Sequence, residues 1–324
     1  MLKTYYDYNI YQDFLKSKPD DLYGDHFHRW HQYWRFLKSS TNLVITNYCE
    51  THANNLITQL TTGRGKSKCA IESNFKRFHK SIVPNGYGLS DSFFMNETCE
   101  TNQLKYRKRN SHYFGFISDH FNAFENLAFI NKKKVIPIRI DNKINEFTSW
   151  DILNDYLLPF SDCIIIDNYL FSETDPILKI NIGKILQIID NKAPKRYNLL
   201  IITYRGKNRE INISNIQKFL LTIKNECSLK ANISVIATSK IEHDRNIFMN
   251  YMRISSKHSF NYLGNNCTPM VKSEIEFLSY ADSENFENAQ VILKDVSSNI
   301  CKVLDKRNTS EVFGNCENRL LITE

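Results

Sequence analysis

Short apolar runs alternate with helix-patterned segments, and this alternation constrains the fold more than any other feature of the chain. In the second half the runs CIIIDNYLF, NLLIITYR and NISVIATS begin at residues 163, 198 and 232. Segments with helical spacing of apolar residues lie between them, at about 176–190 and 214–227, with Ser214 as the expected cap of the second. Strands joined by helices are typical of parallel sheets covered by helices. The second half is therefore predicted to be an α/β domain.

The first half has the same organisation. Its predicted strands are LVITN, CAIE, SFFMN, FGFIS and VIPIRI, and helix-patterned segments separate them. A polar, turn-rich segment, DNKINEFTSWD at residues 141–151, divides the two halves. The length of 324 residues is enough for two domains of ordinary size. We predict an N-terminal α/β domain over 1–145 and a second α/β domain over 146–324 with a helical tail, both built on mainly parallel sheets.

Composition is that of a globular protein, with 42% apolar and 24% charged residues. No apolar run approaches the roughly 18 residues of a membrane-spanning helix. The eight cysteines are scattered without a CxxC pair, which signals neither a disulfide framework nor a zinc site. These features predict a soluble, cytoplasmic protein with reduced thiols, no membrane span, no metal and no cofactor.

The charge distribution favours polyanionic partners. The formal net charge is +7, and basic residues cluster at 105–109, at 132–134 and on both sides of the strand at residue 198, where Arg196 and Arg205 lie. Clustered lysine and arginine are the electrostatic signature of nucleic-acid binding, although solvated loop ends give the same pattern. Nucleic acid is therefore the expected partner, and Arg196 and Arg205 are candidate ligand-binding residues.

The segment HDRNIFMNYMRISSKHSF, which starts at His243, carries the candidate catalytic residues. It resembles the H-x-K-x4-D-x6-G-S-x-N motif of the phospholipase-D-like superfamily, with His243, Arg245 and Asn250 at the His, Lys and Asp positions. Lys257 and His258 stand where the motif has Gly-Ser. The resemblance implies a phospholipase-D-like second domain in which His243 attacks phosphorus and Arg245 holds phosphate oxygens. With one motif per chain, it also implies a twofold homodimer.

The departures from that motif favour binding over catalysis. Arg245 keeps the positive charge and adds a planar fork that can hold phosphate. Asn250 removes a negative charge that would stabilise the imidazolium of His243, and Lys257 places a side chain where backbone would approach the phosphate. A His-Asp-Arg version of this fold, in proteins that act with the ESCRT machinery, is a binding module. The predicted function is binding of a phosphate-rich ligand, with nucleic acid favoured, together with residual phosphodiesterase or nuclease activity in a bacterial antiviral defence system.

One alternative is a membrane-surface module like the ESCRT-associated relative, which would need affinity for anionic lipid over nucleic acid. Two more alternatives remain open. In one, the chain is a noncatalytic protein-interaction subunit and the His-Asp-Arg segment is structural. In the other, strand-end aspartates (Asp119, Asp162 and Asp167) hold magnesium for a metal-dependent nuclease. The histidines of GDHFHRWHQYW are expected on an aromatic helix rather than at a metal. TTGRGKS at residues 61–67 lacks the first glycine of a phosphate-binding loop, because Leu60 stands there.

Overall fold

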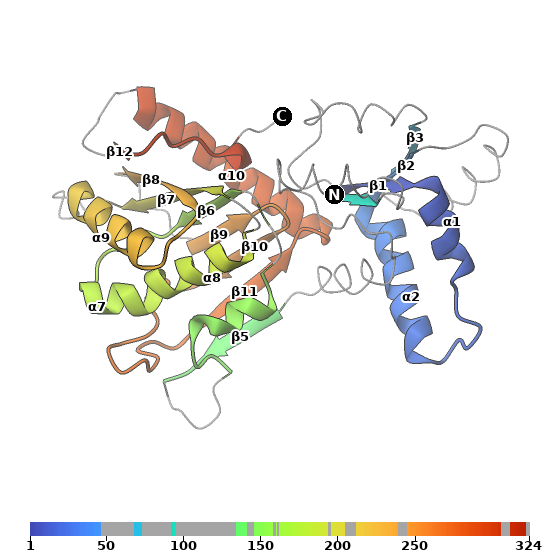
Figure 1. The fold of residues 1–324 in the computed structure, drawn as a ribbon, viewed down its shortest axis with the longest axis horizontal. Helices are drawn as coiled ribbons and strands as arrows, with labels where there is room; N and C mark the ends of the chain where they lie inside the picture. Colours follow the sequence, from blue (N-terminus) through green and yellow to red (C-terminus); the bar gives the residue numbers. More distant parts are fainter. Residues whose placement is uncertain are drawn as a thin grey trace. The chain divides into compact units, whose positions relative to one another are not determined.

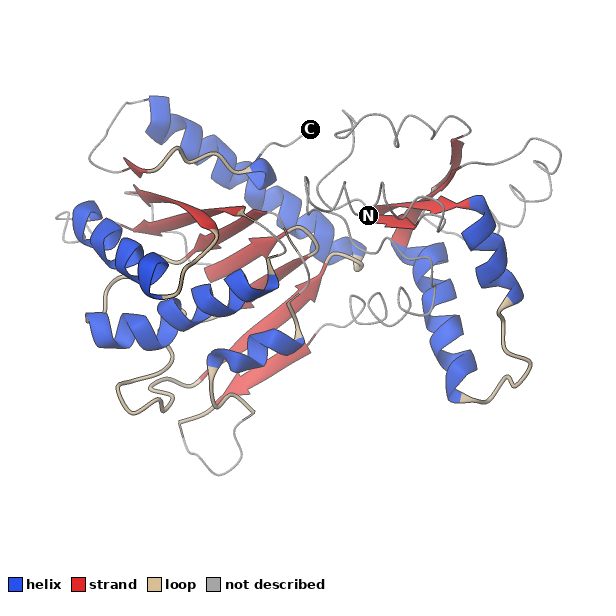
Figure 2. Ribbon diagram, in the orientation of Figure 1, coloured by secondary structure: helices blue, strands red, loops and turns tan. Residues whose placement is uncertain are grey.

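The computed structural model describes residues 1–46, 68–72, 92–94, 134–140, 146–157, 160, 162–193, 196–204, 212–238, 245–305 and 312–321. The chain divides into two units, Met1–Lys132 with Ser279–Glu287 (unit 1) and Lys133–Leu278 with Asn288–Glu324 (unit 2). Each unit has its own β-sheet, and helices accompany both sheets (Figure 1, Figure 2). The predicted α/β class is confirmed.

Unit 1 contains a parallel sheet. Its strands are β1 (Leu2–Asp7), β2 (Thr41–Thr46), β3 (Cys69–Glu72) and β4 (Ser92–Phe94), in the order β3-β2-β1-β4. Each neighbouring pair of strands is parallel. The sequence predicted β2, β3 and β4 but not β1, whose Tyr5 and Tyr6 are buried in the core. The predicted strand FGFIS, the helix-patterned segments of the first half, TTGRGKS and the basic clusters up to Lys133 lie outside the described residues.

Two helices connect β1 to β2. They are α1 (Tyr8–Lys16) and α2 (Asp25–Arg35), and α2 continues into the π-helical turn η1 (Phe36–Ser40). Asp7 caps α1, because its side chain accepts a hydrogen bond from the backbone N–H of Asn9. The indole of Trp30 stacks on Phe14 with ring centroids 5.0 Å apart, and its N–H donates to the Phe14 carbonyl at 3.0 Å. The histidine-containing segment therefore forms an aromatic helix, as predicted.

Unit 2 is built on a sheet of eight strands in the order β12-β8-β7-β6-β9-β10-β11-β5. The strands are β5 (Lys134–Ile138), β6 (Asp162–Ile166), β7 (Tyr197–Tyr204), β8 (Ala231–Thr238), β9 (Arg245–Met249), β10 (Met252–Ser256), β11 (Ser273–Ser279) and β12 (Val312–Phe313). β5 belongs to this sheet although it precedes the segment 141–151, where we expected the domains to divide.

The sheet of unit 2 is mixed, whereas we expected it to be mainly parallel. β6, β7 and β8 are parallel to one another, but β9 pairs antiparallel with both β6 and β10. β5 and β12 also pair antiparallel with their neighbours, β11 and β8. Asn250 and Tyr251 alone join β9 to β10, and a connection of two residues can only join antiparallel strands.

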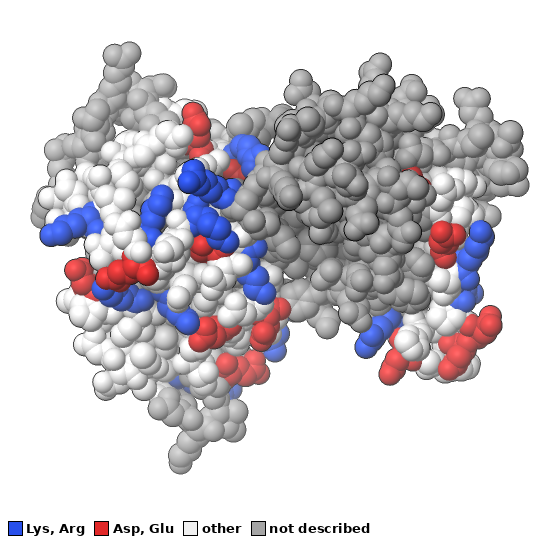
Figure 3. All heavy atoms as spheres, in the orientation of Figure 1, with Lys and Arg blue, Asp and Glu red and all other residues white. Residues whose placement is uncertain are grey.

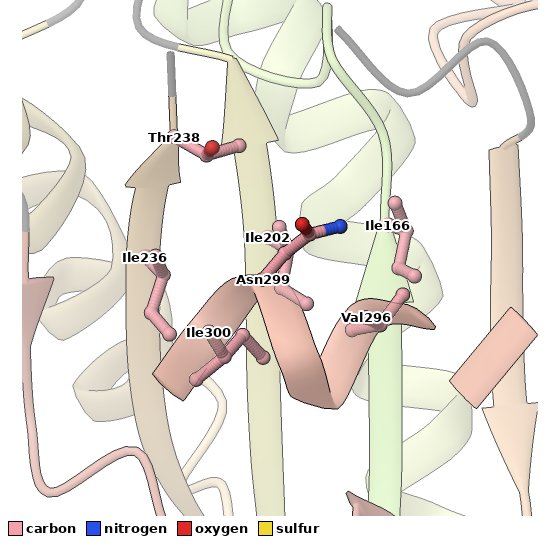
Figure 4. Close-up of a pocket in the computed structure, with 7 residues that line it drawn as sticks. All are labelled: Ile166, Ile202, Ile236, Thr238, Val296, Asn299 and Ile300. Carbon is pink, nitrogen blue, oxygen red and sulfur yellow. The ribbon is translucent and has the colours of Figure 1, made fainter. Parts of the chain in front are cut away.

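Helices cover both faces of the sheet of unit 2. One face carries η4 (Trp150–Asp155), the continuous run α7 (Asp175–Leu178), η5 (Lys179–Gly183) and α8 (Lys184–Lys192), and α9 (Ile213–Glu226). The C-terminal part of α10 (Ser283–Asp305) lies on the other face, with the strands between it and the helices behind (Figure 4). A final turn, η7 (Arg319–Leu321), ends the described chain. α9 is capped by Asn212 and not by Ser214, because the Asn212 side chain accepts the N–H of Ser214 at 2.8 Å.

Candidate functional site

The carboxyl ends of the parallel strands gather the candidate residues of unit 2. β6, β7 and β8 end at Ile166, Tyr204 and Thr238, and the register places the start of β9 and the end of β10 at the same edge. The strand order reverses at β6, since β7 and β8 lie on one side of it and β9 lies on the other. In open α/β sheets, ligands bind outside the carboxyl ends of the strands where the order reverses. We call this rim the carboxyl edge.

Three predicted site residues lie at the carboxyl edge. Arg245 is the first residue of β9, and Lys257 and His258 directly follow β10. Two more, His243 and Arg205, lie outside the described residues. In the sequence, segment 239–244 directly follows β8, and segment 205–211 directly follows β7.

The other two predicted residues lie at the opposite ends of the strands, away from the carboxyl edge. Asn250 is buried in the turn after β9, where its side-chain oxygen accepts the N–H of Asp162 at 3.4 Å. Arg196 is exposed just before β7 begins. β9 separates Arg245 from Asn250 by roughly 16 Å, at about 3.3 Å for each residue of a strand. The structure therefore does not bring Asn250 and Arg196 together with Arg245.

Asp167 links two segments of the carboxyl edge by hydrogen bonds. Its carboxylate is fully buried and accepts three hydrogen bonds, from the backbone N–H of Tyr169 (3.0 Å), the hydroxyl of Ser259 (2.8 Å) and the backbone N–H of Phe260 (2.8 Å). Burial raises the pKa of the Asp167 carboxyl, and the three hydrogen bonds and the nearby Arg245 partly oppose that rise. The residue ties the end of β6 to the segment that follows β10.

Arg245 and Tyr169 meet beside this carboxylate. The central guanidinium carbon of Arg245 lies 5.7 Å from the centroid of the Tyr169 ring, within the range of a cation–π contact. Arg245 is half-buried, whereas Tyr169 is 45% exposed. A positive charge and an exposed aromatic ring thus share one place at the carboxyl edge.

Lys257 and His258 already have partners within unit 2. The ammonium of Lys257 pairs with Glu274 of β11 at 2.5 Å, and this carboxylate raises the pKa of the lysine. The His258 ring lies tilted toward Tyr262, and its Nδ1 is 3.3 Å from the Ser259 carbonyl. The Ser256 hydroxyl bonds both to the Tyr262 hydroxyl and to the His258 carbonyl. These contacts fix the segment after β10.

The strand-end aspartates do not converge. Asp162 and Asp167 stand at opposite ends of β6, too far apart to share one ion, and Asp119 lies outside the described residues. The Asp162 carboxylate is fully buried and receives Nη2 and Nε of Arg319 at 2.6 and 3.0 Å. Within the described ranges, no group of three His, Cys, Asp or Glu side chains is arranged to hold a metal ion.

A small pocket lies on the α10 face of the same edge. Ile166, Ile202 and Ile236 form one row across β6, β7 and β8, and α10 covers them with Val296 and Ile300 (Figure 4). Thr238 and Asn299 add the polar atoms of the lining, and the enclosed space has room for about one water molecule. This pocket is too small for a nucleotide.

Asn246 extends this row onto β9, where it pairs with Ile166. It is 1% exposed, and neither of its amide atoms has a hydrogen-bond partner in the part of the chain that the structure describes. Sequence reasoning missed both Asn246 and Tyr169. Asn246 directly follows Arg245, and Tyr169 follows the strand-end Asp167 by two residues.

The surface of unit 2 carries both signs of charge. In the view of Figure 3, lysine and arginine side chains lie among aspartate and glutamate side chains. Among the described helices, none is long and apolar enough to cross a membrane. A comparison with protein-family models found no matching family, and a comparison with curated proteins found no match. What the fold defines is an α/β protein of two units, one with a parallel sheet and one with a mixed sheet.

Proposed function

We propose that unit 2 binds a phosphate-rich ligand, with nucleic acid favoured, at the carboxyl edge of its sheet. The observation that carries the proposal is the position of Arg245, which begins β9 where the strand order reverses and lies against the exposed ring of Tyr169. A guanidinium is planar and always charged, and it holds two phosphate oxygens with parallel hydrogen bonds.

The sequence around the carboxyl edge supports the same ligand. The segment 205–211, which follows β7, contains Arg205, Lys207 and Arg209 with a single glutamate. The segment 239–244, which follows β8, contains Lys240 and His243 together with Glu242 and Asp244, so the cations come mainly from 205–211. Binding that depends on several such cations releases counterions from the nucleic acid, so the affinity should fall steeply with salt. A docking interface for an apolar protein surface would lack this dependence.

His243 enters the proposal through the phospholipase-D-like resemblance. It lies two residues before Arg245, and as a nucleophile it would make the site a metal-independent phosphodiesterase. Asn250 has no part in the proposed site, because it is buried at the other edge of the sheet. Lys257 has a smaller part than its charge suggests, since Glu274 pairs with it.

The test compares Arg245→Gln with Arg196→Gln. Both substitutions remove one arginine charge from unit 2, but Arg196 is exposed at the opposite edge and serves as the matched control. Arg245→Gln is expected to weaken binding of labelled DNA and RNA oligonucleotides about tenfold and to lower the salt slope by about one. Arg196→Gln should change the affinity less than twofold. Equal losses in the two variants would refute a localised site.

Cleavage is measured with the same oligonucleotides. Wild type and His243→Ala are incubated with each, with magnesium or with EDTA. Cleavage that survives EDTA and disappears in the His243 variant is the result expected of a histidine phosphodiesterase. Cleavage that needs magnesium and ignores the substitution would remove His243 from the proposal.

A further inference from the structure

We infer that the ligand of the carboxyl edge is single-stranded nucleic acid, and that an unpaired base stacks on the ring of Tyr169. This inference rests on the proposed function and specifies its ligand. Arg245 would contact the phosphate that follows the stacked base. The supporting observations concern Tyr169, its backbone and its neighbours.

Tyr169 is an unusual aromatic residue for unit 2. Among the Phe, Tyr and Trp side chains that the structure describes there, it alone is exposed, at 45%, while the others are half-buried or buried. Its place is at the carboxyl edge, three residues beyond the end of β6. An exposed ring at a ligand-binding edge offers a stacking surface that needs no rearrangement of the core.

The backbone beneath this ring is fixed. The N–H of Tyr169 donates to Asp167 at 3.0 Å, and its carbonyl accepts the Ser172 hydroxyl at 2.8 Å and the Asn261 side chain at 3.0 Å. The Ser172 N–H also donates to this carbonyl, at 3.1 Å. Such a ring loses little conformational freedom when a ligand binds, since only its side-chain torsions remain to be ordered.

The chemistry of stacking selects single strands. Bases inside a duplex already lie between their neighbours and offer no free face to a protein ring, whereas unpaired bases do. Stacking on an aromatic side chain tolerates any base, because every base has a π face. The adjacent Arg245 supplies the positive charge that a neighbouring phosphate requires.

The experiment compares single-stranded and double-stranded oligonucleotides of one sequence, with wild type, Tyr169→Ala, Tyr169→Phe and Arg245→Gln. Tyr23→Ala is the control, because Tyr23 is 91% exposed in unit 1. Tyr169→Ala is expected to weaken single-strand binding by about five- to a hundredfold and duplex binding less than twofold. Tyr169→Phe should retain the affinity, since its ring still stacks. Arg245→Gln should weaken both.

The failure of the inference can be told apart from the failure of the proposed function. Duplex preference in the wild type, or equal single-strand affinity in Tyr169→Ala and wild type, would overturn the inference and leave the proposed function standing. Absence of binding to any oligonucleotide would overturn both. An unchanged melting temperature of Tyr169→Ala shows that the variant is folded, and this is expected because the substitution removes an exposed ring.

Discussion

Replacing Arg319 by methionine is expected to lower the free energy of unfolding of unit 2 by about 3 kcal/mol. The Arg319 guanidinium lies against Oδ2 of Asp162 at 2.6 and 3.0 Å, and the side chain of this aspartate is 0% exposed. Methionine replaces the apolar stem of the arginine but leaves the buried carboxylate without its guanidinium.

The magnitude follows from the surroundings of the pair. Removing one partner of a buried ion pair costs about 3–5 kcal/mol. Two features place the expected cost at the lower end of this range. Its Oδ1 keeps hydrogen bonds from the backbone N–H of Arg319 (3.3 Å) and the side chain of Asn198 (3.4 Å), and the arginine side chain is 39% exposed to water.

Hydrogen exchange of the backbone amides of β6 and β7 measures this loss of stability in the strands next to the ion pair. A loss of about 3 kcal/mol corresponds to exchange that is faster by about a hundredfold in these strands. Arg196→Met is the control, since it removes an exposed arginine near the same edge. Adding Asp162→Asn to Arg319→Met should restore part of the stability, because the buried charge is gone. A change below tenfold in the single variant would refute the account of the buried pair.

Two further predictions concern buried polar groups near the carboxyl edge. Asn246→Val should raise the free energy of unfolding, measured by urea denaturation, by about 1 kcal/mol, because it removes a buried amide without hydrogen-bond partners in the described chain. A lower free energy of unfolding would mean that the amide has hydrogen-bond partners in solution. Burial raises the pKa of Asp167, so between the ordinary Asp pKa and the raised pKa the folded protein binds a proton that the unfolded chain has released. The stability that this proton contributes is therefore lost as pH rises through that window. Asp167→Asn should flatten that slope, and an identical slope in both proteins would contradict it.

The fold was predictable where apolar runs were continuous. The runs at 163, 198 and 232 became β6, β7 and β8, because a strand buried on both faces needs apolar residues at successive positions. β1 was not predicted, because its sequence LKTYYD has tyrosines in the middle and no continuous aliphatic run. β11 carried a usable signal, since Ile275 and Phe277 are buried and alternate with glutamates. β12 has only two residues and leaves no pattern to read.

The candidate site was predictable only in part, because spacing along a chain does not say which end of a sheet a residue occupies. Arg245 and Asn250 are five residues apart and were both predicted as site residues from one resemblance, yet they lie at opposite ends of β9. Tyr169 belongs to no motif. Its significance comes from the hydrogen bonds that fix its backbone and from the approach of Arg245, which is distant in sequence.

The pairing of Asp162 with Arg319 also has a consequence for synthesis on the ribosome. The two residues are 157 positions apart, so at about 5–20 residues per second the counterion of β6 is translated roughly 8–30 s after the strand itself. During that interval the nascent β6 contains a carboxylate that its neighbours would bury without the guanidinium. We expect the central strands to remain accessible to chaperones until residue 319 has emerged, so that ribosomes stalled late in translation would present an incompletely packed sheet.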